Sequence, residues 1–189
     1  MNIDKKYYQE INKNLTNTIQ DTNISAPNKK VGKVRDAYFL NDKVVMISTD
    51  RQSAFDRVLA AIPYKGAVLN SVSAWWFKKT EHLFPNHLIS TPDPNVSIVE
   101  KCTVFPVEFV VRGYITGTTD TSLWTVYNNG DREYCGNSLP EGLKKNDKLD
   151  KPMLTPTTKD KVHDRPVSRE EIIDLGLMSA EDYDLAAKM

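Results

Sequence analysis

The sequence has no excess of charge of either sign and very little cysteine. Its 189 residues contain 25 Lys and Arg against 25 Asp and Glu, so the formal net charge is zero. Proteins that coat nucleic acid carry a basic excess, and this balance therefore argues against that class. The two cysteines, Cys102 and Cys135, have no C-x-x-C spacing and no neighbouring histidine in the sequence. This pattern argues against a zinc site and favours reduced thiols.

Long hydrophobic runs are also missing. The longest apolar stretches, such as Val58–Ile62, are far too short to cross a membrane, and Met1–Lys6 has no signal-peptide core. With 40% hydrophobic and 26% charged residues, the composition is that of a globular protein of one large or two small domains. We therefore expect a cytoplasmic protein that binds neither membranes nor nucleic acid.

Hydrophobic periodicity predicts both helices and strands. Helices are expected over residues 4–20 and 66–84, where apolar residues recur every three or four positions. Strands are expected over residues 31–40 and 43–48, joined by a hairpin turn at Asn41-Asp42. The pattern thus predicts an α+β protein.

Other local signals place a domain boundary and two late helices. A strand is expected over residues 98–104, and the proline that follows it suggests a first domain at 1–104 and a second at 105–189. Ser168 with Glu171 matches a helix capping box, and Ser179 with Asp182 resembles one. For the pair Trp75-Trp76 a core or interdomain role is favoured over base stacking.

One stretch, residues 105–118, combines a strand pattern with a row of polar side chains. Alternation puts apolar side chains on one face of the expected strand: Val107, Phe109, Val111, Gly113 and Ile115. The opposite face carries Glu108, Val110, Arg112, Tyr114 and Thr116. Because Arg binds phosphates and carboxylates in a bidentate manner, this face suits the floor of a polar ligand site. The alternative is an edge strand with a solvated polar face.

Three further polar clusters are candidates for ligand binding. Gly32-Lys33-Val34-Arg35-Asp36 offers a glycine and two cations that can cover phosphates, or is only the charged face of a hairpin. Residues 48–56 form a dense polar loop after a buried strand, and their Ser and Asp side chains can equally cap turns. The third cluster runs from Pro152 to Arg165 and includes the adjacent pair His163-Asp164.

These sequence motifs, in this order, resemble those of the phosphoribosylaminoimidazole-succinocarboxamide synthase (SAICAR synthetase) family. The resemblance rests on residues 32–36, 49–56 and 107–117, followed by Leu154–Lys159 and His163-Asp164. It implies an α+β fold with a small antiparallel ATP-binding lobe similar to a kinase N-lobe. The second lobe would be ATP-grasp-like and incomplete in this chain. Residues 1–104 would form the first lobe, and residues 105–189 would begin the second, substrate-binding lobe.

The resemblance also implies roles for individual residues. The expected catalytic residues are Lys33, Arg35 and Asp56. The residues expected to bind ATP are Gly32, Lys33, Val34 and Glu108. Those expected to bind the other substrates are Arg51, Ser53, Arg112, Gly117, Thr118, Thr157, Lys159 and His163. Of these, Arg112 and Thr118 match positions that hold the 5′-phosphate of the ribonucleotide. ATP and Mg²⁺ are the implied cofactors, and the sequence identifies no metal ligands.

The implied reaction is ATP-dependent joining of L-aspartate to the carboxylate of carboxyaminoimidazole ribonucleotide, a step of purine synthesis. ATP would convert the carboxylate to an acyl phosphate, which the amine of aspartate then attacks. Such phosphoryl transfer depends on positioning and charge neutralisation, for which Lys, Arg and Mg²⁺ are suited. The implied enzyme is an ATP-dependent carbon–nitrogen ligase. We expect small-molecule partners and a possible homo-oligomer.

The end of the chain leaves a second hypothesis open. The last predicted helix continues to Met189 without a glycine, proline or polar tail, so we expect a missing C-terminal portion. The metal-binding acids of the family would lie in that portion. The alternative function is therefore a non-catalytic nucleotide-binding fragment of the same enzyme. A kinase-like phosphotransferase is disfavoured because no H-R-D or D-F-G motif is present in the sequence.

Overall fold

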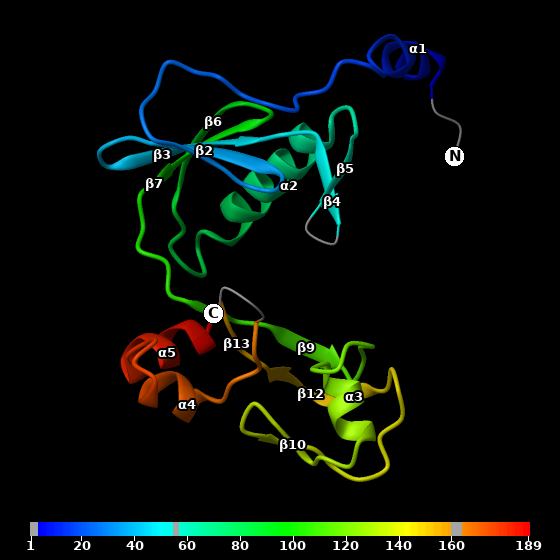
Figure 1. The fold of residues 1–189 in the computed structure, drawn as a ribbon, viewed down its shortest axis with the longest axis vertical. Coiled ribbons are helices and arrows are strands. Elements are labelled where there is room, and N and C mark those ends of the chain that lie inside the picture. Colours follow the sequence, from blue (N-terminus) through cyan, green and yellow to red (C-terminus); the bar gives the residue numbers. More distant parts are fainter. Residues whose placement is uncertain (1–3, 55–56, 160–163) are drawn as a thin grey trace. The chain divides into compact units, whose positions relative to one another are not determined.

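The computed structural model describes residues 4–54, 57–159 and 164–189, and the chain forms two compact units (Figure 1). Unit 1 is Met1–Cys102 and unit 2 is Thr103–Met189. Both units mix helices with strands, and every strand pair in the described parts is antiparallel. No helix within these described ranges is long and apolar enough to span a membrane.

Unit 1 is built on a five-stranded sheet in the order β1-β2-β3-β7-β6. The strands are β1 (Lys29–Val31), β2 (Arg35–Phe39), β3 (Lys43–Ser48), β6 (Leu88–Asp93) and β7 (Val96–Glu100). The predicted β2–β3 hairpin is confirmed, since the N–H of Leu40 donates to the carbonyl of Lys43 across the turn, at 2.9 Å. The aromatic ring of Tyr38 and the side chains of Val44, Ile47 and Val99 are buried in this unit.

The single strand expected over residues 31–40 is wrong, because the chain turns back within it. Gly32–Arg35, which we call the glycine turn, joins β1 to β2, and the N–H of Gly32 donates to the carbonyl of Arg35 at 2.8 Å. A Cβ atom on Gly32 would lie 2.7 Å from that carbonyl oxygen. Such an approach needs glycine, and the alternation of side chains alone does not reveal it.

Helix α2 (Lys65–Thr80) packs beside the sheet, next to the hairpin formed by β4 (Arg51–Ala54) and β5 (Arg57–Ala61) (Figure 1). The helix starts within one residue of the predicted helix over residues 66–84, and it ends four residues before the predicted end. The side chains of Trp75 and Trp76 are 55% and 56% exposed within the structure, so a core role for them is wrong, whereas the interdomain alternative stays a prediction. They contact each other edge to face, with ring centroids 4.8 Å apart.

The first helix, α1 (Lys5–Lys13), is shorter than the predicted helix over residues 4–20. Apolar residues continue at helical spacing beyond it, but the main chain of Ile19 bonds elsewhere. Its N–H donates to Asp50 Oδ2 and its carbonyl accepts from the N–H of Asp50, both at 2.8 Å. These contacts with a distant residue replace the helical hydrogen bonds that the local pattern predicts.

In its described residues, 103–159 and 164–189, unit 2 contains three two-stranded antiparallel pairs and three short helices. The strands are β8 (Val107–Glu108), β9 (Val111–Tyr114), β10 (Glu133–Tyr134), β11 (Asn137–Ser138), β12 (Lys148–Leu154) and β13 (Thr157–Thr158). The helices are α3 (Leu123–Asn128), α4 (Arg169–Asp174) and α5 (Ala180–Ala187). One apolar cluster surrounds Ile115 and Leu123, and another surrounds Val167 and Ile172.

The strand expected over residues 105–116 is two strands with different partners. β8 pairs with β13, whereas β9 pairs with β12. The proposed apolar face holds at its ends, because Val107 and Phe109 pack on one cluster and Ile115 is buried in the other. It fails at Val111, whose side chain is 67% exposed. The change of partner at residues 109–110 interrupts the alternation.

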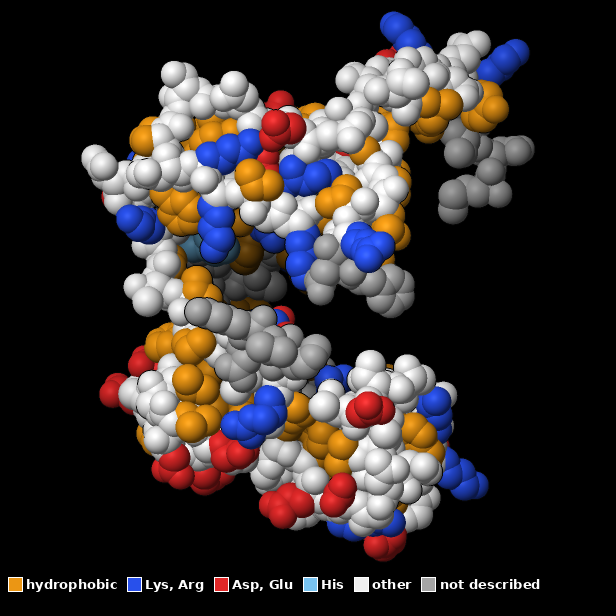
Figure 2. Space-filling model, in the orientation of Figure 1, with side chains coloured by type: hydrophobic (Ala, Val, Ile, Leu, Met, Phe, Trp, Pro, Cys, Tyr) orange, Lys and Arg blue, Asp and Glu red, His pale blue; other side chains and the backbone are white. Residues whose placement is uncertain are grey.

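The caps predicted for α4 and α5 are confirmed. Ser168 and Glu171 form a reciprocal capping box, and Ser179 Oγ accepts from the N–H of Asp182 at 3.0 Å. The first turns of both helices are acidic, where the helix dipole stabilises negative charge. Figure 2 shows acidic side chains gathered on this part of unit 2.

Candidate functional site

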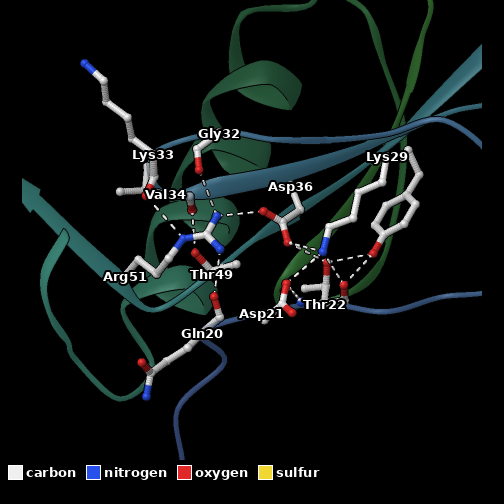
Figure 3. Close-up of polar contacts among 11 residues, drawn as sticks. Gln20, Asp21, Thr22, Lys29, Gly32, Lys33, Val34, Asp36, Thr49 and Arg51 are labelled. Carbon is white, nitrogen blue, oxygen red and sulfur yellow. Dashed lines mark hydrogen bonds and ion pairs between the residues drawn. The ribbon is translucent and has the colours of Figure 1, made fainter. Parts of the chain in front are cut away.

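The glycine turn of unit 1 is held in place by hydrogen bonds that other residues donate to its main-chain carbonyl groups. The carbonyls of Gly32 and Lys33 accept from Arg51 Nη2 and Nε, at 3.0 and 3.2 Å. The carbonyl of Val34 accepts from both the N–H and the Oγ1 of Thr49, at 3.1 and 2.9 Å. Three successive carbonyls are thus fixed from one side. Figure 3 shows the Lys33 side chain pointing away from Arg51.

Arg51 and Asp36 form a buried ion pair next to the turn (Figure 3). Arg51 Nη2 lies 2.7 Å from Asp36 Oδ1, and the Asp36 side chain is 0% exposed. Burial raises the pKa of the Asp36 carboxyl, but hydrogen bonds from Arg51, Thr22 and Lys29 outweigh it and hold the pKa below its ordinary value. Arg51 also donates to the carbonyl of Gln20 at 2.7 Å. Its guanidinium therefore serves four oxygen atoms of the chain, and the structure gives it a structural use beside its predicted ligand role.

A pocket of about 330 Å³ lies in unit 1 beside the glycine turn. Its floor carries a buried hydrogen bond, in which Ser97 Oγ donates to Asn70 Oδ1 at 2.8 Å. Asn70 also donates to the carbonyl of Pro94, at 3.0 Å, so its orientation is fixed. Apolar side chains from the glycine turn, the sheet and α2 complete the pocket: Val34, Met46, Leu69, Phe77, Leu88 and Val99. A mixed apolar and polar cavity of this kind suits an organic ligand with a few polar groups.

The polar loop expected at residues 48–56 is mostly not a loop. Residues 51–54 form β4, which pairs with β5, and Ser53 on this strand is half-buried. Asp50 accepts main-chain hydrogen bonds from Ile19 and, at 2.9 Å, from Gly66 at the start of α2. The capping alternative is therefore the observed use of Asp50. Asp56 lies outside the described residues.

In unit 2, several predicted residues come together around Lys159. Lys159 Nζ lies 2.6 Å from Glu108 Oε2 and 2.9 Å from Asp164 Oδ2. Thr157 pairs with Glu108 across β13 and β8. Hydrogen bonds from Glu108 and then Asp164 raise the pKa of Lys159 above its ordinary value, so it is charged at neutral pH.

The predicted phosphate-binding residues lie along β9 and just beyond it. Arg112 is half-buried on β9, and its Nε donates to Thr155 Oγ1 at 3.0 Å, which fixes the guanidinium. Gly117 has a φ of 119°, and a Cβ there would lie 2.3 Å from the Ser122 Cβ, so only glycine fits. Thr118 is exposed. His163 lies outside the described residues.

Sequence reasoning missed several residues that shape these sites. Thr49 and Thr155 are buried threonines that orient the glycine turn and Arg112, and the sequence placed both inside motifs but predicted no orienting role for them. Thr22 donates to Asp36 at 2.7 Å from a segment that reads as a plain connector. Asn70 and Ser97 give no sequence signal, because their pairing depends on the packing of α2 against β7.

Solved structures with the same architecture define the class of fold. The SAICAR synthase from Saccharomyces cerevisiae, solved as a complex with SAICAR, has a TM-score of 0.73 and is 28% identical. The alignment covers 90% of this chain and 63% of that one. A type-2 SAICAR synthetase in complex with ADP shares the fold, with a TM-score of 0.65 at 24% identity, over 85% and 63% of the two chains. The chain therefore has the SAICAR synthase fold, a mixed α+β fold with antiparallel sheets.

The sequence comparisons identify the family. The family model described as SAICAR synthetase matches residues 28–189, and the chain belongs to this family. A phosphoribosylaminoimidazole-succinocarboxamide synthase of Legionella pneumophila strain Lens is 59% identical over 166 residues, 88% of this chain and 53% of the relative. A chloroplastic synthase of Vigna aconitifolia is 56% identical over 175 residues, 90% of this chain and 51% of the relative. The chain thus spans about half the length of the curated relatives it matches.

Proposed function

We propose that the chain works as part of a phosphoribosylaminoimidazole-succinocarboxamide synthase. This ATP-dependent ligase of purine biosynthesis would join L-aspartate to the carboxylate of carboxyaminoimidazole ribonucleotide and release ADP and phosphate. The observation that carries the proposal is the family match over residues 28–189, supported by 59% identity to a synthase. ATP would transfer a phosphoryl group to the carboxylate, and the amine of aspartate would displace phosphate from the acyl phosphate.

Unit 1 would bind ATP at the glycine turn and the adjoining pocket. Gly32 allows the tight turn, and the carbonyls of the turn are held from one side by Arg51 and Thr49. Lys33 at the tip and the exposed Arg35 on β2 would neutralise phosphate charge. The pocket, whose lining includes Val34 and Arg35, would accept the remainder of the nucleotide. We propose Lys33 and Arg35 as catalytic residues, together with Asp56.

Unit 2 would bind the ribonucleotide and aspartate. Arg112, held by Thr155, presents its remaining guanidinium donors to the 5′-phosphate, with Gly117 and Thr118 beside the end of the strand. Such a charge-assisted contact is directional and strong. Lys159 and Thr157 would contact carboxylate groups of the substrates, and the contact with Glu108 holds Lys159 in place. The roles predicted for Glu108 in ATP binding, and for Arg51, Ser53 and His163 in substrate binding, stay predictions.

No ligands for Mg²⁺ are assigned among the described residues. The two buried acids near the glycine turn, Asp36 and Asp50, already accept hydrogen bonds from the chain. No three His, Cys, Asp or Glu side chains within residues 4–54, 57–159 and 164–189 lie close enough together to hold a metal. Mg²⁺, the homo-oligomer and the cytoplasmic location stay predictions from the sequence, and some relatives are chloroplastic enzymes.

Two calorimetric titrations test the proposal. Residues 1–189 are titrated with ATP and with carboxyaminoimidazole ribonucleotide, and ADP release is then followed with ATP, Mg²⁺, aspartate and the ribonucleotide together. We expect Lys33→Ala to lower the affinity for ATP and to leave the affinity for the ribonucleotide unchanged. The matched control is Lys43→Ala. Lys43 begins β3, whereas Arg35 pairs with Ser48 at the other end of that strand. If the wild-type chain bound neither ligand, the proposal would be wrong for this chain, and ATP binding without ADP release would favour a nucleotide-binding role without catalysis.

A further inference from the structure

The segment Ile19–Thr22, which we call the strap, runs from the end of the α1 region to the sheet of unit 1. The hydrogen bonds that hold it in place are made mainly to its main-chain groups. Asp50 bonds both main-chain groups of Ile19, and Arg51 Nη1 donates to the carbonyl of Gln20 at 2.7 Å. Tyr38 and Lys29 both donate to the carbonyl of Thr22. The strap thus follows a fixed path although it has no regular secondary structure.

Two side chains of the strap add to these contacts, and they converge on the same charged network (Figure 3). Thr22 Oγ1 donates to Asp36 Oδ2 at 2.7 Å and lies 2.9 Å from the hydroxyl of Tyr38. Asp21 Oδ1 lies 2.7 Å from Lys29 Nζ, which is also 3.2 Å from Asp36 Oδ2. The buried carboxylate of Asp36 is therefore satisfied partly from the strap and partly from Arg51.

Arg51 is the residue that joins the strap to the glycine turn. Its Nη1 donates to Gln20 in the strap, while Nη2 and Nε donate to the carbonyls of Gly32 and Lys33 in the turn. Because the guanidinium group is planar and rigid, its donors cannot move independently. A change in the position of the strap, or of Asp36, must therefore change the position of the donors that hold the turn.

We propose that the strap is a positioning element of the ATP-binding glycine turn, acting through Asp36 and Arg51. The proposal rests on the function proposed above, since that function makes the turn an ATP site. It goes beyond that function because residues 19–22 precede the range matched by the family model, which begins at residue 28. Thr22 is the positioning residue, because its hydroxyl is a donor to the Asp36 oxygen that Arg51 does not use.

Thr22→Val tests the coupling, since valine keeps the shape of threonine and removes the hydroxyl. Hydrogen exchange is measured at the amides of Gly32–Arg35 and of β3, and ATP and the ribonucleotide are each titrated. We expect exchange in the turn to become about 2- to 12-fold faster, and ATP to bind more weakly within the same range, which corresponds to one hydrogen bond. Exchange in β3 and affinity for the ribonucleotide are expected to stay unchanged.

Two companion variants make the result specific. Thr22→Ser keeps the hydroxyl and is expected to restore wild-type exchange in the turn and wild-type affinity for ATP. Thr16→Val changes an exposed threonine before the strap and is expected to have no effect.

The outcomes separate this proposal from the function proposed above. Unchanged exchange in the turn of Thr22→Val would overturn the positioning role, and so would an equal rise in β3, which indicates a general loss of stability. Faster exchange confined to the turn together with unchanged ATP affinity would also overturn it. If the wild-type chain bound no ATP, the function proposed above would fail, whereas the exchange data would still test the link between strap and turn.

Discussion

Replacing Arg51 with alanine should destabilise unit 1 more than any change at an exposed arginine. The substitution removes the donors to Gln20, Gly32, Lys33 and Asp36. Removing one partner of a buried ion pair costs about 3–5 kcal/mol, because the other charge is left without compensation. The Asp36 carboxylate is 0% exposed but keeps Thr22 and Lys29 as donors, so we expect about 3 kcal/mol, the lower end of that range.

The assay is urea unfolding followed by tryptophan fluorescence in a Trp124→Phe background. The remaining tryptophans, Trp75 and Trp76, both belong to α2, so the signal reports on unit 1. A loss of about 3 kcal/mol lowers the midpoint by about 1.5 M urea for a slope of about 2 kcal/mol/M. The matched control is Arg57→Ala, at an exposed position of β5, for which we expect a change of at most about 0.5 kcal/mol.

A double-mutant cycle with Asp36→Asn separates the ion pair from the other contacts of Arg51. If the pair carries the effect, the double variant loses less stability than the sum of the single variants, by about 0.5–3 kcal/mol. Additive losses would refute the ion-pair reasoning. A midpoint for Arg51→Ala equal to that of Arg57→Ala would refute the whole account of the buried guanidinium.

Three further predictions concern binding and acid stability. Gly32→Ala places a Cβ 2.7 Å from the Arg35 carbonyl, so titration should show ATP affinity reduced roughly 5-fold or more, with ribonucleotide affinity unchanged. Arg112→Ala should weaken the ribonucleotide by about 10- to 150-fold and leave ATP unaffected, and equal losses for both ligands would contradict this. The control, Arg169→Ala, removes an arginine that binds Asp184 in α5. Because the folded-state pKa of Asp36 is lowered, its contribution to stability is complete above the unfolded pKa of about 4 and is lost as pH falls through the folded pKa. Thermal melts from pH 7 to 2 should therefore show a smaller acid loss for Asp36→Asn, and an undiminished loss would contradict this.

Local patterns were sufficient where contacts are local. The β2–β3 hairpin and the capping box at Ser168 both depend on residues within a few positions of one another. The predicted first helix failed because Asp50, more than thirty residues away, binds the main chain of Ile19. The strand over residues 105–116 failed because alternation does not reveal a change of pairing partner.

The candidate site shows the same division. Glycine followed by cations marked Gly32 and Lys33 as candidates for phosphate binding, since residue type and order carry that signal, but the turn that they form was predicted as strand. Arg51 was predicted only as a ligand residue, because nothing in the local sequence reveals that carbonyls at positions 20, 32 and 33 take up its donors. Residue patterns indicate which side chains can bind a ligand, and folding decides which of them are already engaged.

The main-chain attachment of the strap has an evolutionary consequence. Ile19 and Gln20 are recognised by peptide groups that almost every residue type possesses, so their side chains can be exchanged while the path of the segment is kept. Homologous chains can therefore keep the backbone path of this segment while the residue types at these positions differ. Proline at position 19 is the exception, because it has no N–H to donate to Asp50. A search for this element in relatives should accordingly compare backbone traces and look for the absence of that one amino acid.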